Sequence, residues 1–157
     1  MPDFQSVILA AGKGTRLKSQ KAKVLHEVLG RPMIGHSVRA ALGSGAERAV
    51  VVTGYNRENV EQWLTENEES DRIEFAVQQE QLGTGHAVWM AEDYLRDGPE
   101  YTLIQYGDVP LMDADTLREF TELVIDSRRP VGLMTAVVDD PDEYGRVVRD
   151  DDRDVMA

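Results

Sequence analysis

Five cations lie in or just after a glycine-rich turn near the start of the chain: Lys13, Arg16, Lys18, Lys21 and Lys23. Four small residues occupy the same turn: Ala10, Ala11, Gly12 and Gly14. Without bulky side chains, the backbone amides of this stretch can approach a ligand closely. Successive amides in such a loop form a concavity that binds anions. Together with the cations, they indicate polyphosphate binding.

The spacing of this loop excludes two common phosphate-binding patterns. A P-loop requires G-x-x-x-x-G-K-[ST], but Val7 stands five residues before Gly12, and Lys13 is followed by Gly14. A dinucleotide-binding fingerprint requires a small residue three positions after Gly14, where Leu17 stands. A plain strand-to-loop turn with a solvated basic face stays open as the alternative.

The distribution of charge favours the phosphate interpretation. The formal net charge is −12, yet residues 1–40 hold seven Lys or Arg and only two acidic side chains, against ten and 27 in the remainder. An acidic chain that gathers its cations around one glycine-rich loop is suited to hold an anion there. It does not have the basic surface of a typical nucleic-acid-binding protein, so we expect no nucleic-acid partner.

Apolar periodicity predicts alternating strands and helices. We expect strands at 4–9, 49–53, 73–77, 102–106, 131–138 and 144–149, and helices at 33–42, 58–66, 87–95 and 116–125. This order predicts an α/β fold with a Rossmann-like, mostly parallel sheet and helices on both faces. Polar clusters follow three of these strands, at 10–16, 78–86 and 107–110. Ligands in such folds bind beyond the carboxyl ends of the strands, so the three clusters predict one composite site.

Two of these clusters carry side chains with recognisable chemistry. Asp108 follows a buried strand and Gly107, and a carboxylate facing a polyphosphate would hold Mg²⁺ between them. A turn aspartate that binds its own backbone is the structural alternative. Gln78 begins a glutamine-rich run whose amides match the donor and acceptor on a uracil edge, although a solvated loop would have the same composition.

Length and composition restrict the number of domains, the kinds of metal site and the cellular location that we expect. The 157 residues suffice for one domain, and there is no cysteine for a disulfide or a thiolate metal site. His26, His36 and His86 lack the spacing of a metal trio. With neither a signal peptide nor an apolar run of membrane-spanning length, we expect a cytoplasmic protein with no membrane partner. The acidic turn at 150–152 leaves three residues for a returning strand, so we expect the natural chain to continue.

Five segments together closely resemble one bacterial family: Leu9–Arg16 (LAAGKGTR), Lys23–His26 (KVLH), Gln81–Ala87 (QLGTGHA), Tyr106–Leu111 (YGDVPL) and Asp140–Arg146 (DPDEYGR). This family is the uridylyltransferase domain of bifunctional N-acetylglucosamine-1-phosphate uridylyltransferase/glucosamine-1-phosphate acetyltransferase. The resemblance implies a nucleotide-diphospho-sugar transferase (GT-A-like) fold over residues 1–157. It also implies transfer of uridylate from UTP to N-acetylglucosamine 1-phosphate, which supplies a precursor of peptidoglycan and lipopolysaccharide.

The resemblance also implies roles for individual residues. The nucleotide would be lined by Leu9, Ala10, Ala11 and Gly12, and its phosphates held by the catalytic Arg16 and Lys23. The uracil would contact Gln78, Gly83 and Thr84. Tyr106 and Gly107 would lie along the nucleotide-sugar, Asp108 would ligate Mg²⁺, and Gly145 would approach the sugar.

Two departures from the family pattern bear on these expectations. Ala22 replaces the proline that usually precedes the loop lysine, which makes the placement of Lys23 less fixed. The second metal ligand of the family, an asparagine, lies beyond residue 157, as does the acetyltransferase β-helix that forms a homotrimer. Activity of residues 1–157 alone is therefore left open. The alternatives are another sugar-1-phosphate or cytidylyl nucleotidyltransferase, and a non-catalytic nucleotide-binding module.

Overall fold

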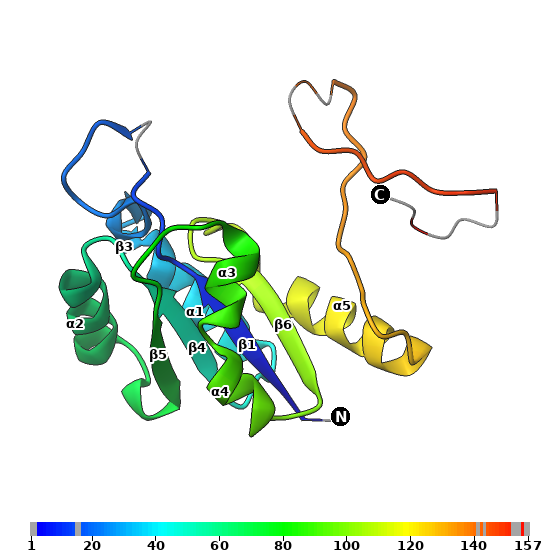
Figure 1. Cartoon of the computed structure of the whole chain (residues 1–157), viewed down its shortest axis with the longest axis horizontal. Helices are drawn as coiled ribbons and strands as arrows, with labels where there is room; N and C mark the ends of the chain where they lie inside the picture. The colour runs from blue at the N-terminus through cyan, green and yellow to red at the C-terminus, as the bar shows by residue number, and fades with distance from the viewer. Residues whose placement is uncertain (1–2, 15–16, 141, 143, 152–154, 156–157) are drawn as a thin grey trace.

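The computed structural model describes residues 3–14, 17–140, 142, 144–151 and 155. Its centre is a sheet of four strands: β1 (Phe4–Leu9), β4 (Ala49–Thr53), β5 (Ile73–Val77) and β6 (Tyr101–Tyr106). They lie in the order β5-β4-β1-β6, and each neighbouring pair is parallel (Figure 1). Because all four run the same way, their carboxyl ends meet at one edge of the sheet.

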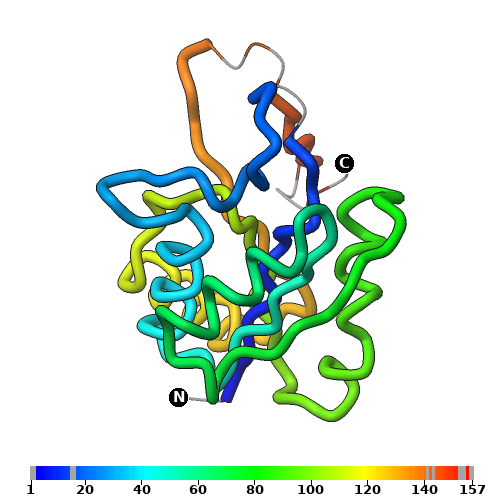
Figure 2. Tube along the Cα trace, turned by 90° about the vertical axis from the view of Figure 1, so that its left-hand side faces the viewer, coloured from blue at the N-terminus to red at the C-terminus, as the bar shows by residue number. Residues whose placement is uncertain are grey.

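Helices cover both faces of this sheet, as the sequence predicts. Ile8 and Val51 pack toward α1 (Met33–Gly43) and α2 (Arg57–Asn67), whereas their neighbours Val7, Val50 and Val52 pack toward the opposite face. This alternation follows from the two-residue period of a strand. The second face is covered by α3 (Thr84–Trp89) and α4 (Glu92–Arg96). Figure 2 shows the sheet between these two helical layers.

The last helix, α5 (Ala114–Ser127), packs beside α1 at the β6 end of the sheet. Leu117 of α5 joins Phe4, Ala40 and Leu103 in a buried cluster. None of the helices in the described part of the chain combines the length and the apolar character needed to cross a membrane.

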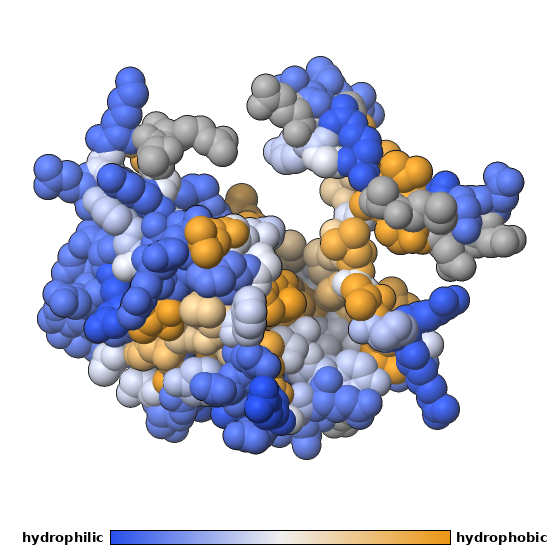
Figure 3. All heavy atoms as spheres, viewed as in Figure 1, coloured by the Kyte–Doolittle hydropathy of each residue, from blue (hydrophilic) through white to orange (hydrophobic). Residues whose placement is uncertain are grey.

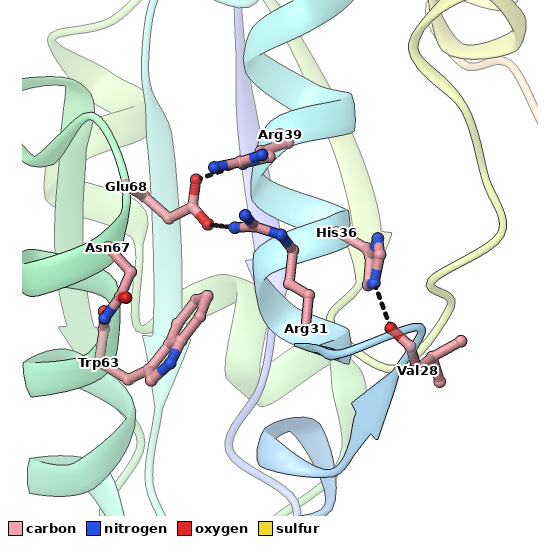
Figure 4. A network of polar contacts seen from close by, with 7 residues as sticks. All are labelled: Val28, Arg31, His36, Arg39, Trp63, Asn67 and Glu68. Carbon is pink, nitrogen blue, oxygen red and sulfur yellow. Dashed lines mark hydrogen bonds and ion pairs between the residues drawn. The ribbon is translucent and has the colours of Figure 1, made fainter.

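A small hairpin follows the glycine-rich loop and is tied to both α1 and α2. The short helix η2 (Lys23–Leu25) leads into β2 (Glu27–Val28) and β3 (Arg31–Pro32). The nearly buried carboxylate of Glu68 pairs with Arg31 of the hairpin and accepts a hydrogen bond of 2.8 Å from Arg39 of α1 (Figure 4). The network fixes the segment that follows Lys23. A second short helix, η3 (Ser70–Arg72), precedes β5.

Three predicted elements differ from the structure. The helix expected at 87–95 is divided into α3 and α4, because the Ala91 N–H bonds to the Val88 carbonyl three residues back and the chain turns there. The segment 131–138 is not a strand, since no described strand supplies it with hydrogen-bond partners, and Val131 and Val137 are exposed. The strand expected at 144–149 is reduced to one antiparallel bridge between Arg149 and Val155.

Candidate active site

The parallel ladder continues past the strand ends and brings the predicted polar clusters together. The Ala10 N–H donates to the Val52 carbonyl at 2.9 Å, and the Gly107 N–H donates to the Leu9 carbonyl at 2.9 Å. On the other side, the Gln78 N–H donates to the Thr53 carbonyl at 2.8 Å. The turn after β1 therefore lies between the segment after β6 and the segment after β5. This placement agrees with the single composite site expected from the sequence.

A cleft of about 330 Å³ opens at this edge. Ten of the residues predicted for substrate binding line it: Leu9, Ala10, Ala11, Gly12, Lys23, Gln78, Gly83, Thr84, Tyr106 and Asp108. The cleft is mostly apolar in the middle, where alanine side chains leave the backbone accessible, and it is charged at the Lys23 end. Such a surface is suited to a ligand with a flat organic part and an anionic part.

Gly14 positions Lys23 at this end of the cleft. Its φ is +64°, and a Cβ at Gly14 would lie 2.6 Å from the Lys23 Cβ. Any side chain at Gly14 would therefore displace Lys23 as well as strain the turn. The sequence neighbours of Lys23, Ala22 and Val24, are buried, so the backbone at Lys23 is packed into the core although no proline precedes it.

The Lys23 ammonium forms an ion pair with the Asp108 carboxylate across the cleft. Their side chains keep 42% and 25% of their surface exposed, so the pair is open to solvent and to a ligand. Asp108 reaches this place because Gly107 passes close to β1 and α1: a Cβ there would lie 3.2 Å from the Leu9 carbonyl oxygen and 2.9 Å from the Ile34 side chain. A cation and a carboxylate that face each other can separate when a phosphate and a metal ion bind between them.

Gln78 forms the other end of the cleft and is almost fully buried. Its amide nitrogen lies 3.1 Å from the Gly83 carbonyl oxygen and 2.9 Å from the His86 Nδ1. These contacts hold the turn of residues 78–86 against α3. The sequence-based expectation that this amide offers a base both a donor and an acceptor is not met here, because the nitrogen is used within the protein.

Some predicted site residues do not line the cleft, and some lining residues were not predicted. Gly107 lies behind the cleft wall, and Gly145 belongs to the exposed segment after α5. Arg16 lies outside the described residues. Four further lining residues were given no individual role from the sequence: Gly14, Val24, Gln81 and Ala87. All four stand inside the quoted motifs, so their motif positions were a usable signal, and Gly14 was already expected as part of the glycine-rich turn.

Of the described residues that line this cleft, Asp108 alone carries a carboxylate that could hold a cation. Among the described residues, no three His, Cys, Asp or Glu side chains gather into a metal cluster. Mg²⁺ commonly binds through one or two carboxylates together with phosphate oxygens and water. The single carboxylate therefore fits a Mg²⁺ ion that is shared with a bound polyphosphate and does not fit a permanent protein-only site.

The fold and the cleft define a nucleotide-handling α/β domain, with a glycine turn, a lysine and an aspartate at the strand ends of a parallel sheet. Residues 5–157 match the family model described as nucleotidyl transferase, and the chain belongs to the nucleotidyl transferase family.

Curated relatives agree with this assignment. The chain is 44% identical over 157 residues to the bifunctional protein GlmU of Caldanaerobacter subterraneus subsp. tengcongensis, covering 99% of this chain and 33% of that protein. It is 47% identical over 150 residues to the protein of the same name from Exiguobacterium sp., covering 96% and 32%. The chain thus spans about a third of the length of these relatives.

A solved structure supports the fold. HddC from Yersinia pseudotuberculosis, complexed with GMP-PN, aligns with a TM-score of 0.70 and 23% identity, over 100% of this chain and 68% of that one. At this identity the likeness concerns the fold alone. It agrees with the nucleotide-diphospho-sugar transferase fold implied by the sequence.

Proposed function

We propose that this chain forms the nucleotidyl-transfer domain of an enzyme that joins UTP to N-acetylglucosamine 1-phosphate, giving UDP-N-acetylglucosamine and pyrophosphate. The observation that carries the proposal is the shared cleft of Lys23, Asp108 and Gln78. This cleft offers contacts for a polyphosphate at one end and contacts for a nucleobase at the other. Similarity to bifunctional GlmU proteins and to the motifs of the uridylyltransferase family supports the choice of substrates.

The proposed reaction requires no protein nucleophile. A phosphate oxygen of the sugar phosphate forms a bond to the α-phosphorus of UTP, and the bond from this phosphorus to the α–β bridging oxygen breaks as pyrophosphate leaves. The chain contributes alignment: the 10–14 turn approaches the nucleotide with its backbone, and Lys23 binds phosphate oxygens. Arg16, which lies outside the described residues, keeps its proposed role as the second phosphate cation.

Asp108 is the residue that would hold a Mg²⁺ ion, as the family resemblance implies. Mg²⁺ would neutralise negative charge on the bound phosphates. Lys23 forms an ion pair with this same carboxylate, so the two charges compensate each other.

We also propose that residues 1–157 are the N-terminal part of a longer cytoplasmic protein in which an acetyltransferase β-helix follows and forms a trimer. This rests on the family resemblance and on the fraction of the GlmU relatives that the chain spans.

The proposed function is tested by measuring pyrophosphate release by the full-length protein. UTP, CTP, dTTP and GTP are each combined with N-acetylglucosamine 1-phosphate or glucose 1-phosphate. We expect the largest kcat/KM for UTP with N-acetylglucosamine 1-phosphate. A preference for CTP or glucose 1-phosphate would support the other nucleotidyltransferase classes instead. Nucleotide binding without pyrophosphate release would support a non-catalytic module.

A further inference from the structure

Two contacts on one nitrogen determine the orientation of the Gln78 side-chain amide. The atom 3.1 Å from the Gly83 carbonyl oxygen must be the nitrogen Nε2, because a carbonyl oxygen can only accept a hydrogen bond. The same nitrogen lies 2.9 Å from the His86 Nδ1. Both N–H groups of the amide are therefore directed to protein acceptors, and this pairing defines the orientation of the amide.

This arrangement also determines the tautomer of neutral His86. Its Nδ1 accepts a hydrogen bond from Gln78, so the ring proton must lie on Nε2. His86 thereby takes up the second N–H of Gln78. Without this acceptor, one N–H would lose its partner, and only the Gly83 carbonyl would oppose rotation of the amide by 180°.

The amide oxygen of Gln78 is the part left for a ligand. Gln78 lines the cleft, and among the described residues its Oε1 accepts no hydrogen bond. This oxygen is also not one of the buried polar atoms that lack a partner. A nucleobase at this end of the cleft would therefore meet an acceptor and no donor from Gln78. The N3 position of uracil carries a hydrogen, whereas N3 of cytosine carries a lone pair. An acceptor at this place attracts the first and repels the second.

We propose that His86 is a positioning residue that locks the Gln78 amide with its oxygen toward the cleft, and that this lock makes the site select an imide base such as uracil over cytosine. The inference rests on the proposed function for its nucleotide. It extends that function by assigning base selectivity to a residue that need not touch the base.

The variant His86→Phe tests the lock because it keeps a ring on α3 and removes the acceptor. With only the Gly83 carbonyl left to oppose the flip, the flipped amide gains population and presents a donor to cytosine. We expect the ratio of kcat/KM for UTP to kcat/KM for CTP to fall about tenfold, because kcat/KM rises for CTP and falls for UTP. A tenfold change corresponds to the free energy of about one hydrogen bond. His86→Asn retains an acceptor near the position of Nδ1 and should restore the ratio to within about threefold of wild type.

The matched control is Trp89→Phe on the same helix. Trp89 is exposed, and its indole N–H donates to Glu92 at 2.7 Å. Thermal midpoints of all variants are compared, so that a loss of stability common to the helix is separated from a change in base preference. An unchanged UTP to CTP ratio in His86→Phe, or an equal fall in His86→Asn or in Trp89→Phe, would overturn the selectivity assigned to His86.

A second measurement needs neither a variant nor turnover. Long-range ¹H–¹⁵N correlation spectra of the wild-type protein report which imidazole nitrogen of His86 carries the proton. We expect the Nε2–H tautomer, and the Nδ1–H tautomer would refute the lock. If the wild-type enzyme releases no pyrophosphate from any pyrimidine nucleotide, the proposed function fails, while the tautomer still decides whether His86 holds Gln78 in this orientation.

Discussion

At the scale of single residues, the cleft combines a partly exposed ion pair with a buried, hydrogen-bonded amide. Lys23 and Asp108 are joined across the cleft by an ion pair that remains partly exposed. Gln78, at the other end, is buried and bound on its nitrogen side. An exposed pair contributes little to folding and separates easily, whereas a buried hydrogen-bonded amide holds its geometry. The Lys23 end of the cleft is therefore adjustable and the Gln78 end preorganised.

The Lys23–Asp108 pair leads to a prediction about metal affinity. Without nucleotide, Lys23 competes with a divalent cation for the Asp108 carboxylate. We expect Lys23→Met to raise the affinity of the nucleotide-free protein for Mn²⁺, used as a paramagnetic substitute for Mg²⁺, by about two- to fivefold, because exposed ion pairs are weak. Electron paramagnetic resonance titration measures this directly. Lys21→Met is the control, since Lys21 pairs with Glu27 at 3.9 Å. Equal Mn²⁺ affinity in wild type and Lys23→Met would contradict the competition.

At the scale of elements, the site depends on how the segment after the glycine turn is attached. Lys23 belongs to η2, and the hairpin β2–β3 that follows is held by Arg31 against Glu68 at the end of α2. Trp63 of the same helix packs on α1 at Gly35, where a Cβ would lie 2.5 Å from the indole ring. Arg31 also lies 5.9 Å from the centre of this ring. Helix α2 thus anchors the hairpin through charge and through packing.

Removing the carboxylate of Glu68 should therefore loosen this attachment. Its side chain is 4% exposed, and Glu68→Ala leaves two guanidinium groups without their acceptor. Because Arg31 and Arg39 retain some contact with water, we expect the free energy of unfolding to fall by about 2 kcal/mol. Urea denaturation measures the change. Glu66→Ala, which removes an exposed carboxylate of the same helix, should cost less than about 0.5 kcal/mol. Similar losses in both variants would show that the network does not stabilise the fold.

Helix α5 gives a prediction about pH. Asp113 caps this helix, accepting a hydrogen bond from the Thr116 N–H at 2.7 Å, and this bond lowers the pKa of the Asp113 carboxyl below its ordinary value of 3.8. A lowered folded-state pKa means that the stabilisation is present above pH 3.8 and is lost as the pH falls through the lower folded value.

Two substitutions separate the charge of Asp113 from its capping role. Asp113→Ala should lower the thermal midpoint by a few degrees at neutral pH, because the cap is removed. Asp113→Asn keeps a capping oxygen and should retain most of the stability. The part of the acid-induced loss of stability that comes from protonation of Asp113 should disappear in this variant. The measurement is the thermal midpoint of each protein between pH 7 and pH 3. A steeper acid loss in Asp113→Asn than in wild type would contradict the assignment.

At the scale of the whole molecule, β5 and β6 are the edge strands of the sheet, and the β6 edge lies beside an apolar groove. The outer edge of β6 pairs with no described strand, and Ile104 on it is about half exposed. A groove of about 560 Å³ runs from β6 to α5 and the start of the segment that follows α5. Val131 and Leu133 of that segment are exposed beside it, and Figure 3 shows apolar side chains along this hollow. Unpaired edges and contiguous apolar surfaces of this kind promote association.

We therefore expect the 157-residue chain by itself to bind a hydrophobic dye at this groove. Anilinonaphthalene sulfonate fluorescence should rise on mixing, and the double variant Val131→Asp, Leu133→Asp should reduce it by about half, because the charges oppose burial of the dye. The exposed Leu29, far from the groove in sequence and absent from its lining, is the control position for Leu29→Asp. Undiminished fluorescence in the double variant would place the dye elsewhere.

The sequence by itself determined the parts of this protein that depend on local pattern. The apolar run of β4 and the apolar period of α1 predicted those elements closely. A strand buried on both faces requires a continuous apolar run, and a helix buried along one side requires apolar residues at helical spacing. The turn at 10–14 and Asp108 were predicted as site residues from their types and from their positions after strands, and the structure places them at one edge of the sheet.

Only the tertiary structure decided what depends on partners distant in the chain. The segment 131–138 reads as a strand by composition, but a strand exists only where another supplies its hydrogen bonds, and none of the described strands does. The same holds for Gln78: its sequence position suggests an amide with two functions, and the contacts with Gly83 and His86 leave one. Residue order encodes propensity and burial, whereas the pairing of individual donors and acceptors is settled when the chain is packed.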